Sequence, residues 1–296
     1  MRQEPEEIIC EPKAYLNELM MDDNSGQPSA KEVFDTTPYT ILVVDDNPDM
    51  TDFLKRTFEG YFKRIIIAGD GGEALQLVRS HVPDIIVSDV MMPRMNGYKL
   101  CKTIKENINI SHIPVILLTA RDDRQSQISG YKNGADGYLS KPFEVEMLME
   151  LIRNRLKNRE YTKKRYLNAG LIPTPEESTI SLTDETFLIK LNSIIQENIE
   201  NSNLGIQFIC QEVGLGRSSL YNKLKALTGM GANEYISKLR IEKAITLISG
   251  TDMPFSEIAE KTGFTTPSYF STAFKQYTGE TPSQYKERKK KGLADK

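Results

Sequence analysis

The sequence predicts two domains of different class: an α/β domain with a five-stranded parallel sheet, followed by an all-α domain with two helix-turn-helix modules. Across residues 39–158, short β-branched runs alternate with amphipathic stretches, which is the pattern of βαβ units. The last third has helical periodicity and an internal repeat, which indicates duplicated helical modules. A chain of 296 residues is long enough for two ordinary domains, each with its own core.

Composition and turn-forming residues predict the domain boundaries. Residues 1–38 carry 9 Asp and Glu against 3 Lys and Arg, and this acidic, polar segment is predicted to be a linker. Gly170, Pro173 and Pro175 do not suit a helix interior, so a second linker is expected there. The predicted boundaries are 1–38 for the N-terminal linker, 39–158 for the α/β domain with five strands and five helices, 159–184 for the interdomain linker, 185–290 for the all-α domain and 291–296 for a tail.

Apolar strand-like runs in the α/β domain lead to residues that can bind phosphate or metal. Residues 40–44 are followed by Asp45 and Asp46, residues 84–88 by Asp89, and residues 114–118 by Thr119, while a weaker run leads to Lys141. The carboxyl ends of parallel strands meet at one edge of the sheet, so these side chains should converge. Asp45, Asp46 and Asp89 could bind Mg²⁺, while Lys141 and Thr119 could pair with the oxygens of a phosphoryl group on Asp89.

These residues, in this order, resemble the receiver domain of two-component response regulators, which has a flavodoxin-like fold. The resemblance covers about residues 39–158 and includes Asp45-Asp46, Asp89, Pro93, Gly97, Thr119-Ala120 and Lys141-Pro142. It implies that Asp89 is the phosphoacceptor, that the main-chain carbonyl of Met91 is a further metal ligand, and that the Lys141–Pro142 bond is cis. Tyr138 falls at the family's switch aromatic and Thr119 at its switch hydroxyl, although ordinary packing explains Tyr138 alone equally well.

The acidic residues have two other interpretations. Any one of these aspartates could be a solvated loop carboxylate, but the ordered set argues against that for all of them. A phosphatase with an aspartyl nucleophile would need a second acid two residues later, and Met91 stands there. A switch that hydrolyses slowly is therefore favoured over an enzyme, and the histidine kinase that supplies the phosphoryl group is expected elsewhere.

The internal repeat marks two helix-turn-helix modules. Leu220, Leu224-Lys225, Thr228-Gly229 and Tyr235 recur fifty positions later as Phe270, Phe274-Lys275, Thr278-Gly279 and Tyr285. The predicted helices cover residues 204–213 and 217–225 in the first module and 255–261 and 267–277 in the second, with a connecting helix at 234–248. This second half resembles the arabinose-regulator (AraC/XylS) family over residues 185–290, most clearly at Gly263-Phe264, Pro267-Ser268-Tyr269-Phe270 and Gly279-Glu280-Thr281-Pro282. The resemblance implies two recognition helices in successive major-groove segments of DNA.

Helical spacing divides the residues of the two recognition helices by role. Leu220, Leu224, Phe264, Phe270 and Phe274 are predicted to be core. Base contacts are expected from Ser218, Tyr221, Asn222, Lys225, Pro267, Ser268 and Thr272. Phosphate contacts are expected from Arg217, Lys223, Lys275 and Arg288. The basic run 288–291 is more simply a solvated tail.

The remaining composition restricts the compartment and the partners. Cys10, Cys101 and Cys210 are scattered and odd in number, which favours a reducing cytosol over a disulfide framework. No apolar run reaches the roughly 18 residues that span a bilayer, so a cytoplasmic protein is expected. Residues 205–291 carry 13 Lys and Arg against 8 Asp and Glu, which favours a polyanionic partner.

The prediction is a phosphorylation-controlled, sequence-specific DNA-binding transcription regulator that uses Mg²⁺. Its expected partners are a double-stranded DNA operator, a histidine kinase and a second copy of the chain, with RNA polymerase as a further candidate. In one alternative, the chain is the C-terminal part of a hybrid sensor histidine kinase/response regulator like those of Bacteroides-type bacteria. In another, the helical domain binds protein and not DNA, which predicts no salt-dependent binding to any duplex.

Overall fold

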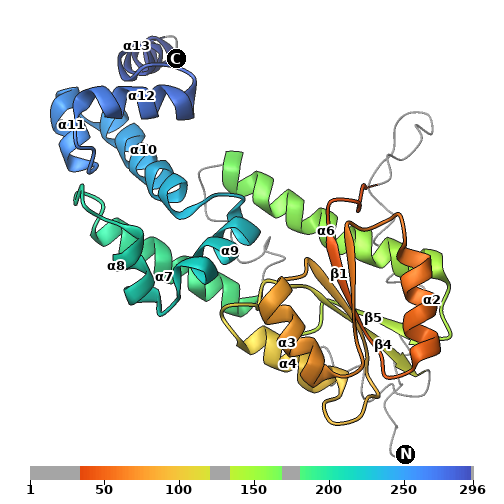
Figure 1. The fold of residues 1–296 in the computed structure, drawn as a ribbon. Coiled ribbons are helices and arrows are strands. Elements are labelled where there is room, and N and C mark those ends of the chain that lie inside the picture. Colours follow the sequence, from red (N-terminus) through yellow and green to blue (C-terminus); the bar gives the residue numbers. More distant parts are fainter. Residues whose placement is uncertain (1–33, 121–133, 169–180, 295–296) are drawn as a thin grey trace, which may run out of the picture. The chain divides into compact units, whose positions relative to one another are not determined.

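One parallel sheet of five strands, in the order β2-β1-β3-β4-β5, organises the first half of the chain (Figure 1). The computed structural model describes residues 34–120, 134–168 and 181–294. The strands are β1 (Thr40–Val44), β2 (Arg64–Ala68), β3 (Ile85–Asp89), β4 (Val115–Ala120) and β5 (Gly137–Lys141). This order confirms the predicted α/β fold with its flavodoxin-like topology.

Helices cover both faces of the sheet (Figure 1). They are α2 (Pro48–Phe58), α3 (Gly71–His81), α4 (Gly97–Glu106) and α6 (Val145–Asn168). Alternate strand residues such as Leu42 and Ile86 join Val78 of α3 and Leu100 of α4 in one cluster. The intervening residues point to the other face, and Leu54 of α2 is completely buried. A strand buried on both faces has to be apolar throughout, which explains the unbroken β-branched runs. The remaining helix predicted for this domain falls on residues 121–133, outside the described residues.

The register of the strands brings their polar ends to one edge. Asp89, the last residue of β3, lies opposite Leu118 of β4. Thr119 lies opposite Ser140, and Ala120 opposite Lys141. The residues predicted to form the phosphoacceptor site therefore lie on, or directly after, four adjacent strands, β1, β3, β4 and β5.

Helix α6 is longer than the sequence predicted. It continues without interruption to Asn168, so it occupies the first ten residues of the segment 159–184 that was predicted to be a linker. Leu148, Ile152 and Leu156 are buried near its start, and Tyr166 near its end joins the core of the helical domain. Packing at both ends explains why the charged residues between them stay helical.

Seven helices make up the described part of the chain from residue 181 onward. They are α7 (Leu182–Glu197), α8 (Ile206–Val213), α9 (Arg217–Thr228), α10 (Ala232–Gly250), α11 (Phe255–Lys261), α12 (Pro267–Thr278) and α13 (Pro282–Ala294). The pairs α8–α9 and α11–α12 are the two predicted helix-turn-helix modules, and their ends lie within three residues of the predicted ones. The second helix of each module, α9 and α12, is called a reading helix below. Both reading helices end at a glycine with positive φ, +74° at Gly229 and +82° at Gly279, so the repeat extends to the backbone conformation.

Each module has its own core, and α10 contributes to both. The first cluster contains Leu220 and Leu224 of α9, and the second contains Phe264, Phe270 and Phe274. All five residues are buried, as predicted. The contacts join the described residues from Asp35 onward into one unit. In the described ranges, no helix combines the length and apolarity needed to span a membrane.

Candidate phosphoacceptor site and reading helices

Asp89 ends β3 at the edge of the sheet and is 7% exposed. The Lys141 ammonium lies 2.6 Å from Asp89 Oδ1 and 2.9 Å from Asp45 Oδ2. The main-chain N–H of Met91 donates to Asp89 Oδ2 at 2.6 Å. One cation therefore joins two carboxylates from neighbouring strands, and the second oxygen of Asp89 is fixed by the backbone.

Burial and charge act on this cluster in opposite directions. The pKa of Asp89 is raised by burial and by the negative charge of Asp45, and the hydrogen bonds from Lys141 and Met91 only partly offset this. Burial lowers the pKa of Lys141, but its hydrogen bonds to Asp89 and Asp45 outweigh that effect and raise it. Lys141 therefore stays positively charged at neutral pH, where it can pair with a phosphoryl group.

Thr119 and Tyr138 follow the acidic cluster on β4 and β5. Thr119 is 1% exposed, and its Oγ1 has no hydrogen-bond partner among the described residues. A buried hydroxyl without a partner is costly, so it is suited to a new acceptor. Tyr138 is half-buried and packs against the cluster that includes α3 and α4. The Lys141–Pro142 bond is cis, as the resemblance implied.

The structure brings some of the predicted metal ligands together but not all of them. Asp45 is 3% exposed and shares Lys141 with Asp89, whereas Asp46 is exposed. In the part of the chain that the structure describes, no group of three or more His, Cys, Asp or Glu is arranged to hold a metal ion. The two buried carboxylates fit a hard cation because they are oxygen ligands that already share a positive charge.

Gly97 lies directly under the site, at the first position of α4. A Cβ at Gly97 would stand 2.3 Å from the main-chain oxygen of Asp89, much closer than atoms can approach. Its N–H also donates to the main-chain oxygen of Val90 at 3.0 Å. Only glycine lets the chain return this close to Asp89.

The residues predicted to contact DNA lie on the exposed surfaces of α9 and α12. On α9 the exposed residues are Arg217, Ser218, Tyr221, Asn222 and Lys225, and on α12 they are Pro267, Ser268, Thr272 and Lys275. Tyr221 is 54% exposed. These residues are accessible to a duplex, and their contact with DNA stays a prediction.

Two residues that were predicted to contact phosphates, Lys223 and Arg288, are paired with protein carboxylates instead. Lys223 is completely buried, which contradicts the expectation that it reaches a phosphate. Arg288 is exposed, but its guanidinium donates to Glu280, with Nη2 at 2.7 Å from Oε1. Glu280 therefore neutralises the charge that was expected to face DNA.

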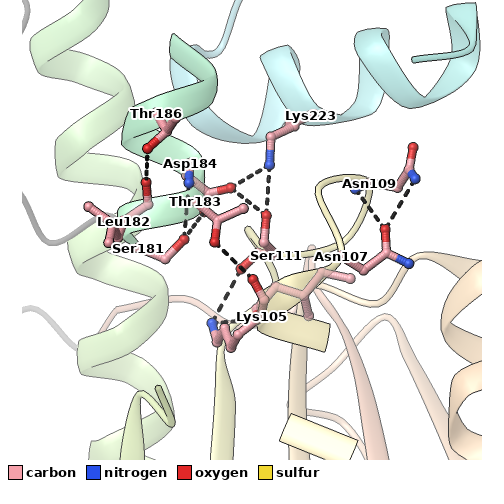
Figure 2. A network of polar contacts seen from close by, with 11 residues as sticks. Lys105, Asn107, Asn109, Ser111, Ser181, Leu182, Thr183, Asp184, Thr186 and Lys223 are labelled. Carbon is pink, nitrogen blue, oxygen red and sulfur yellow. Dashed lines mark hydrogen bonds and ion pairs between the residues drawn. The ribbon is translucent and has the colours of Figure 1, made fainter. Parts of the chain in front are cut away.

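Sequence reasoning missed the polar network that buries Lys223 (Figure 2). The Lys223 ammonium pairs with Asp184 of α7 and donates to Ser111 Oγ at 2.8 Å. Ser111 Oγ in turn donates to Asp184 Oδ1 at 2.7 Å. Ser111 precedes β4, so the network joins residues separated by 112 positions. No local sequence signal marks such a contact, because each residue type is common on surfaces.

Comparison with protein families agrees with both halves of this architecture. The family of the response regulator receiver domain matches residues 41–153, and a helix-turn-helix domain family matches residues 209–288. Together the two matches contain the acidic site and both reading helices.

Two curated proteins are similar to parts of this chain. Histidine kinase P4 of Formosa agariphila is 41% identical over 249 residues, which are 84% of this chain and 18% of that protein. The DNA-binding response regulator MtrA of Mycolicibacterium smegmatis is 35% identical over 136 residues, 46% of this chain and 58% of that protein. This chain therefore spans less than two thirds of either relative.

A solved structure resembles the first half of the chain. The receiver domain of Francisella response regulator 1452 is 38% identical and covers 40% of this chain and 98% of its own, with a TM-score of 0.37. The acidic sheet edge, the duplicated reading helices and the two family matches lead to one conclusion: the chain carries a response regulator receiver domain followed by an AraC-type helix-turn-helix DNA-binding domain.

Proposed function

We propose that the chain is a DNA-binding regulator controlled by phosphorylation of Asp89. The observation that carries this proposal is the Lys141 ammonium bridging Asp89 and Asp45 at 2.6 and 2.9 Å. A half-buried cation between two carboxylates is suited to a carboxylate that gains negative charge. The same chain presents two reading helices with exposed polar surfaces, so the switch and its output share one polypeptide.

Phosphoryl transfer to Asp89 needs a nucleophile, charge neutralisation and a donor for the new oxygens. In the proposed step, an Asp89 carboxylate oxygen attacks the phosphorus of a phosphohistidine on a histidine kinase. The bond from phosphorus to the imidazole nitrogen breaks, and that nitrogen keeps the electron pair. Lys141 pairs with the phosphoryl oxygens, and Thr119, whose hydroxyl has no partner within the described ranges, donates to one of them.

Mg²⁺ is the proposed cofactor, held by Asp45, Asp46, Asp89 and the main-chain carbonyl of Met91. When bound, the ion would supply positive charge that neutralises the phosphoryl oxygens. The buried pair Asp45 and Asp89 fits this role, whereas exposed Asp46 would complete the ligand set through water.

The reading helices are proposed to enter successive major-groove segments. Asn222 is suited to a bidentate contact with adenine, and Thr272 to a thymine methyl or a base edge. Arg217, Lys225 and Lys275 are exposed cations, so they can also contact phosphates, which fix position without reading sequence. Two copies of the chain would bind two half-sites.

The hybrid-kinase alternative is favoured over a free-standing response regulator. The match to Histidine kinase P4 runs over 249 residues, 84% of this chain, whereas the match to MtrA covers 46%. A histidine kinase thus has a stretch similar to both domains of this chain. We infer that this sequence acts as the response-regulator part of such a kinase, which then supplies the phosphoryl group.

The proposal is tested by replacing the acceptor and measuring DNA affinity. The wild-type chain is used to select a duplex from random sequences, and its affinity is measured with and without a small-molecule acyl phosphate. The wild-type affinity should change with the donor, and the Asp89→Asn chain should not respond, while Asp49→Asn, an exposed aspartate of α2, should respond normally. An equal donor response in the Asp89→Asn chain would refute the switch.

Salt dependence separates DNA binding from protein binding. Each phosphate contact adds a slope of about −0.9 to the dependence of log affinity on log salt. Lys225→Ala should reduce this slope by about one, whereas Asn222→Ala should relax sequence preference with little effect on the slope. A chain that binds no duplex at low salt would favour a protein-binding helical domain.

A further inference from the structure

Helix α9 contacts the receiver domain through Lys223, whose ammonium meets Ser111 (Figure 2). Lys223 and Ser111 are completely buried, and Asp184 is 2% exposed. Among the described residues, the polar partners of Lys223 are the Asp184 carboxylate and Ser111 Oγ, and its ammonium also lies 5.1 Å from the centre of the Phe187 ring. A buried ammonium requires such partners. The receiver loop before β4, which carries Ser111, therefore supplies one of the polar partners of Lys223 on α9.

The position of Ser111 depends on strands β4 and β5. Lys105 at the end of α4 donates to the main-chain oxygens of Ser111 at 3.3 Å and Ile113 at 3.0 Å. The Lys105 ammonium also lies 2.7 Å from Asp136 Oδ2, and the same Asp136 oxygen accepts from the N–H of Val115 at 2.7 Å. Asp136 directly precedes β5, the strand that carries Tyr138. A shift of β4 against β5 would therefore move the Ser111 loop.

The contact leaves the reading surface of α9 free. Tyr221, Asn222 and Lys225 are exposed, whereas Lys223 on the same helix is completely buried. The receiver therefore does not block these side chains. It can act on DNA binding through the orientation of α9 relative to α12.

The geometry makes the contact sensitive to small movements. Ser111 Oγ donates to Asp184 and accepts from Lys223, so displacing one hydroxyl breaks two hydrogen bonds that strengthen each other. A cavity of about 80 Å³ lies beside the network, and its lining includes Ser111, Asp184 and Ala226. Space next to a buried polar contact lets the loop move with little overpacking.

We propose that Lys223 is a positioning residue, through which the receiver domain sets the orientation of the first reading helix by way of Ser111 and Asp184. Phosphorylation changes DNA affinity by changing this contact. This inference rests on the proposed function, since it names the route by which Asp89 regulates the reading helices.

The test uses the full chain and the variant Ser111→Ala, which removes the receiver hydroxyl and keeps the Asp184–Lys223 pair. The measured quantity is the ratio of affinities for the selected duplex with and without the acyl phosphate donor. This ratio should fall at least about threefold toward one in Ser111→Ala, while the fraction of phosphorylated Asp89, measured by mass spectrometry, stays as in wild type. The matched control is Ser80→Ala, an exposed receiver serine, which should keep the wild-type ratio.

Hydrogen exchange gives a second measurement that needs no DNA. The amides of residues 219–227 should exchange several-fold faster in Ser111→Ala than in wild type, and Lys223→Met should show the same increase. Unchanged exchange in both variants would overturn the inference, as would an unchanged affinity ratio in Ser111→Ala. A wild-type chain without any donor response would instead refute the proposed function, so the two failures can be told apart.

Discussion

Removing one member of the Asp184–Lys223 ion pair should destabilise the protein more than removing both. Asp184→Leu leaves the Lys223 ammonium at 0% exposure, with Ser111 Oγ and the Phe187 ring as its contacts. An unpaired buried charge of this kind costs about 3–5 kcal/mol.

Lys223→Met should cost less, because the Asp184 carboxylate keeps two hydroxyl donors. Ser111 and Ser181 donate to it at 2.7 and 2.8 Å. The pKa of Asp184 is raised by burial, but the charge of Lys223 and these hydrogen bonds outweigh that effect and lower it. Losing the lysine while keeping the hydroxyls should cost about 1–3 kcal/mol. The double variant removes both charges and should lie within about 2 kcal/mol of wild type.

The free energies of unfolding are measured by urea titration with far-ultraviolet circular dichroism, because the chain has no tryptophan. The double-mutant cycle should give a coupling of at least about 2 kcal/mol. The matched control is the exposed pair Glu257 and Lys261, 3.6 Å apart and nearly half exposed, which should couple by less than about 0.5 kcal/mol. Additive costs at Asp184 and Lys223 would show that the pair is not a buried ion pair.

Three further predictions concern the receiver domain. Gly97→Ala should slow phosphorylation by an acyl phosphate about 10- to 100-fold, because the added Cβ would meet the Asp89 main-chain oxygen at 2.3 Å. The control is Gly69→Ala, whose Cβ would have its nearest neighbour at 3.6 Å. Equal phosphorylation rates in the two variants would refute the steric argument. Lys141→Met should reduce the initial rate of labelling on the order of 100-fold, measured by mass spectrometry, and wild-type labelling would show that the cation is dispensable. Burial, with help from neighbouring cations, lowers the pKa of His112 to about 3 in the folded chain. Below the unfolded pKa of about 6.5, the unfolded chain therefore binds a proton that the native chain does not, and the free energy of unfolding should fall by up to about 1.4 kcal/mol per pH unit as the pH is lowered. His112→Gln should flatten this pH dependence in urea titrations, and an unchanged pH dependence would assign it to other groups.

The sequence was sufficient to predict which side chains meet at this edge of the sheet, because the polar residue that ends a strand is a local signal and the carboxyl ends of parallel strands lie together. Asp89, Thr119 and Lys141 lie where the strand pattern placed them. Asp46 follows Asp45 directly and its side chain is exposed, so its part in binding Mg²⁺ stays a prediction.

The errors concern residues whose environment is set by distant parts of the chain. Lys223 was assigned to the surface because lysine is seldom buried, yet its partners Ser111 and Asp184 lie 112 and 39 positions away. The end of α6 was missed because its charged sequence resembles a linker, whereas the burial of Tyr166 depends on another domain's core. Pattern and propensity do not contain such tertiary partners.

Because helix α6 is unbroken, its length determines how the helical domain is rotated relative to the receiver domain. Its 24 residues extend about 36 Å. Inserting one residue between Leu156 and Tyr166 would turn the far end of the helix by about 100°, and Lys223 could no longer meet Ser111. An insertion of seven residues restores the direction to within about 20° but moves the far end away by about 10 Å. Chimeras that join this receiver to another output domain should therefore conserve both the length and the phase of α6.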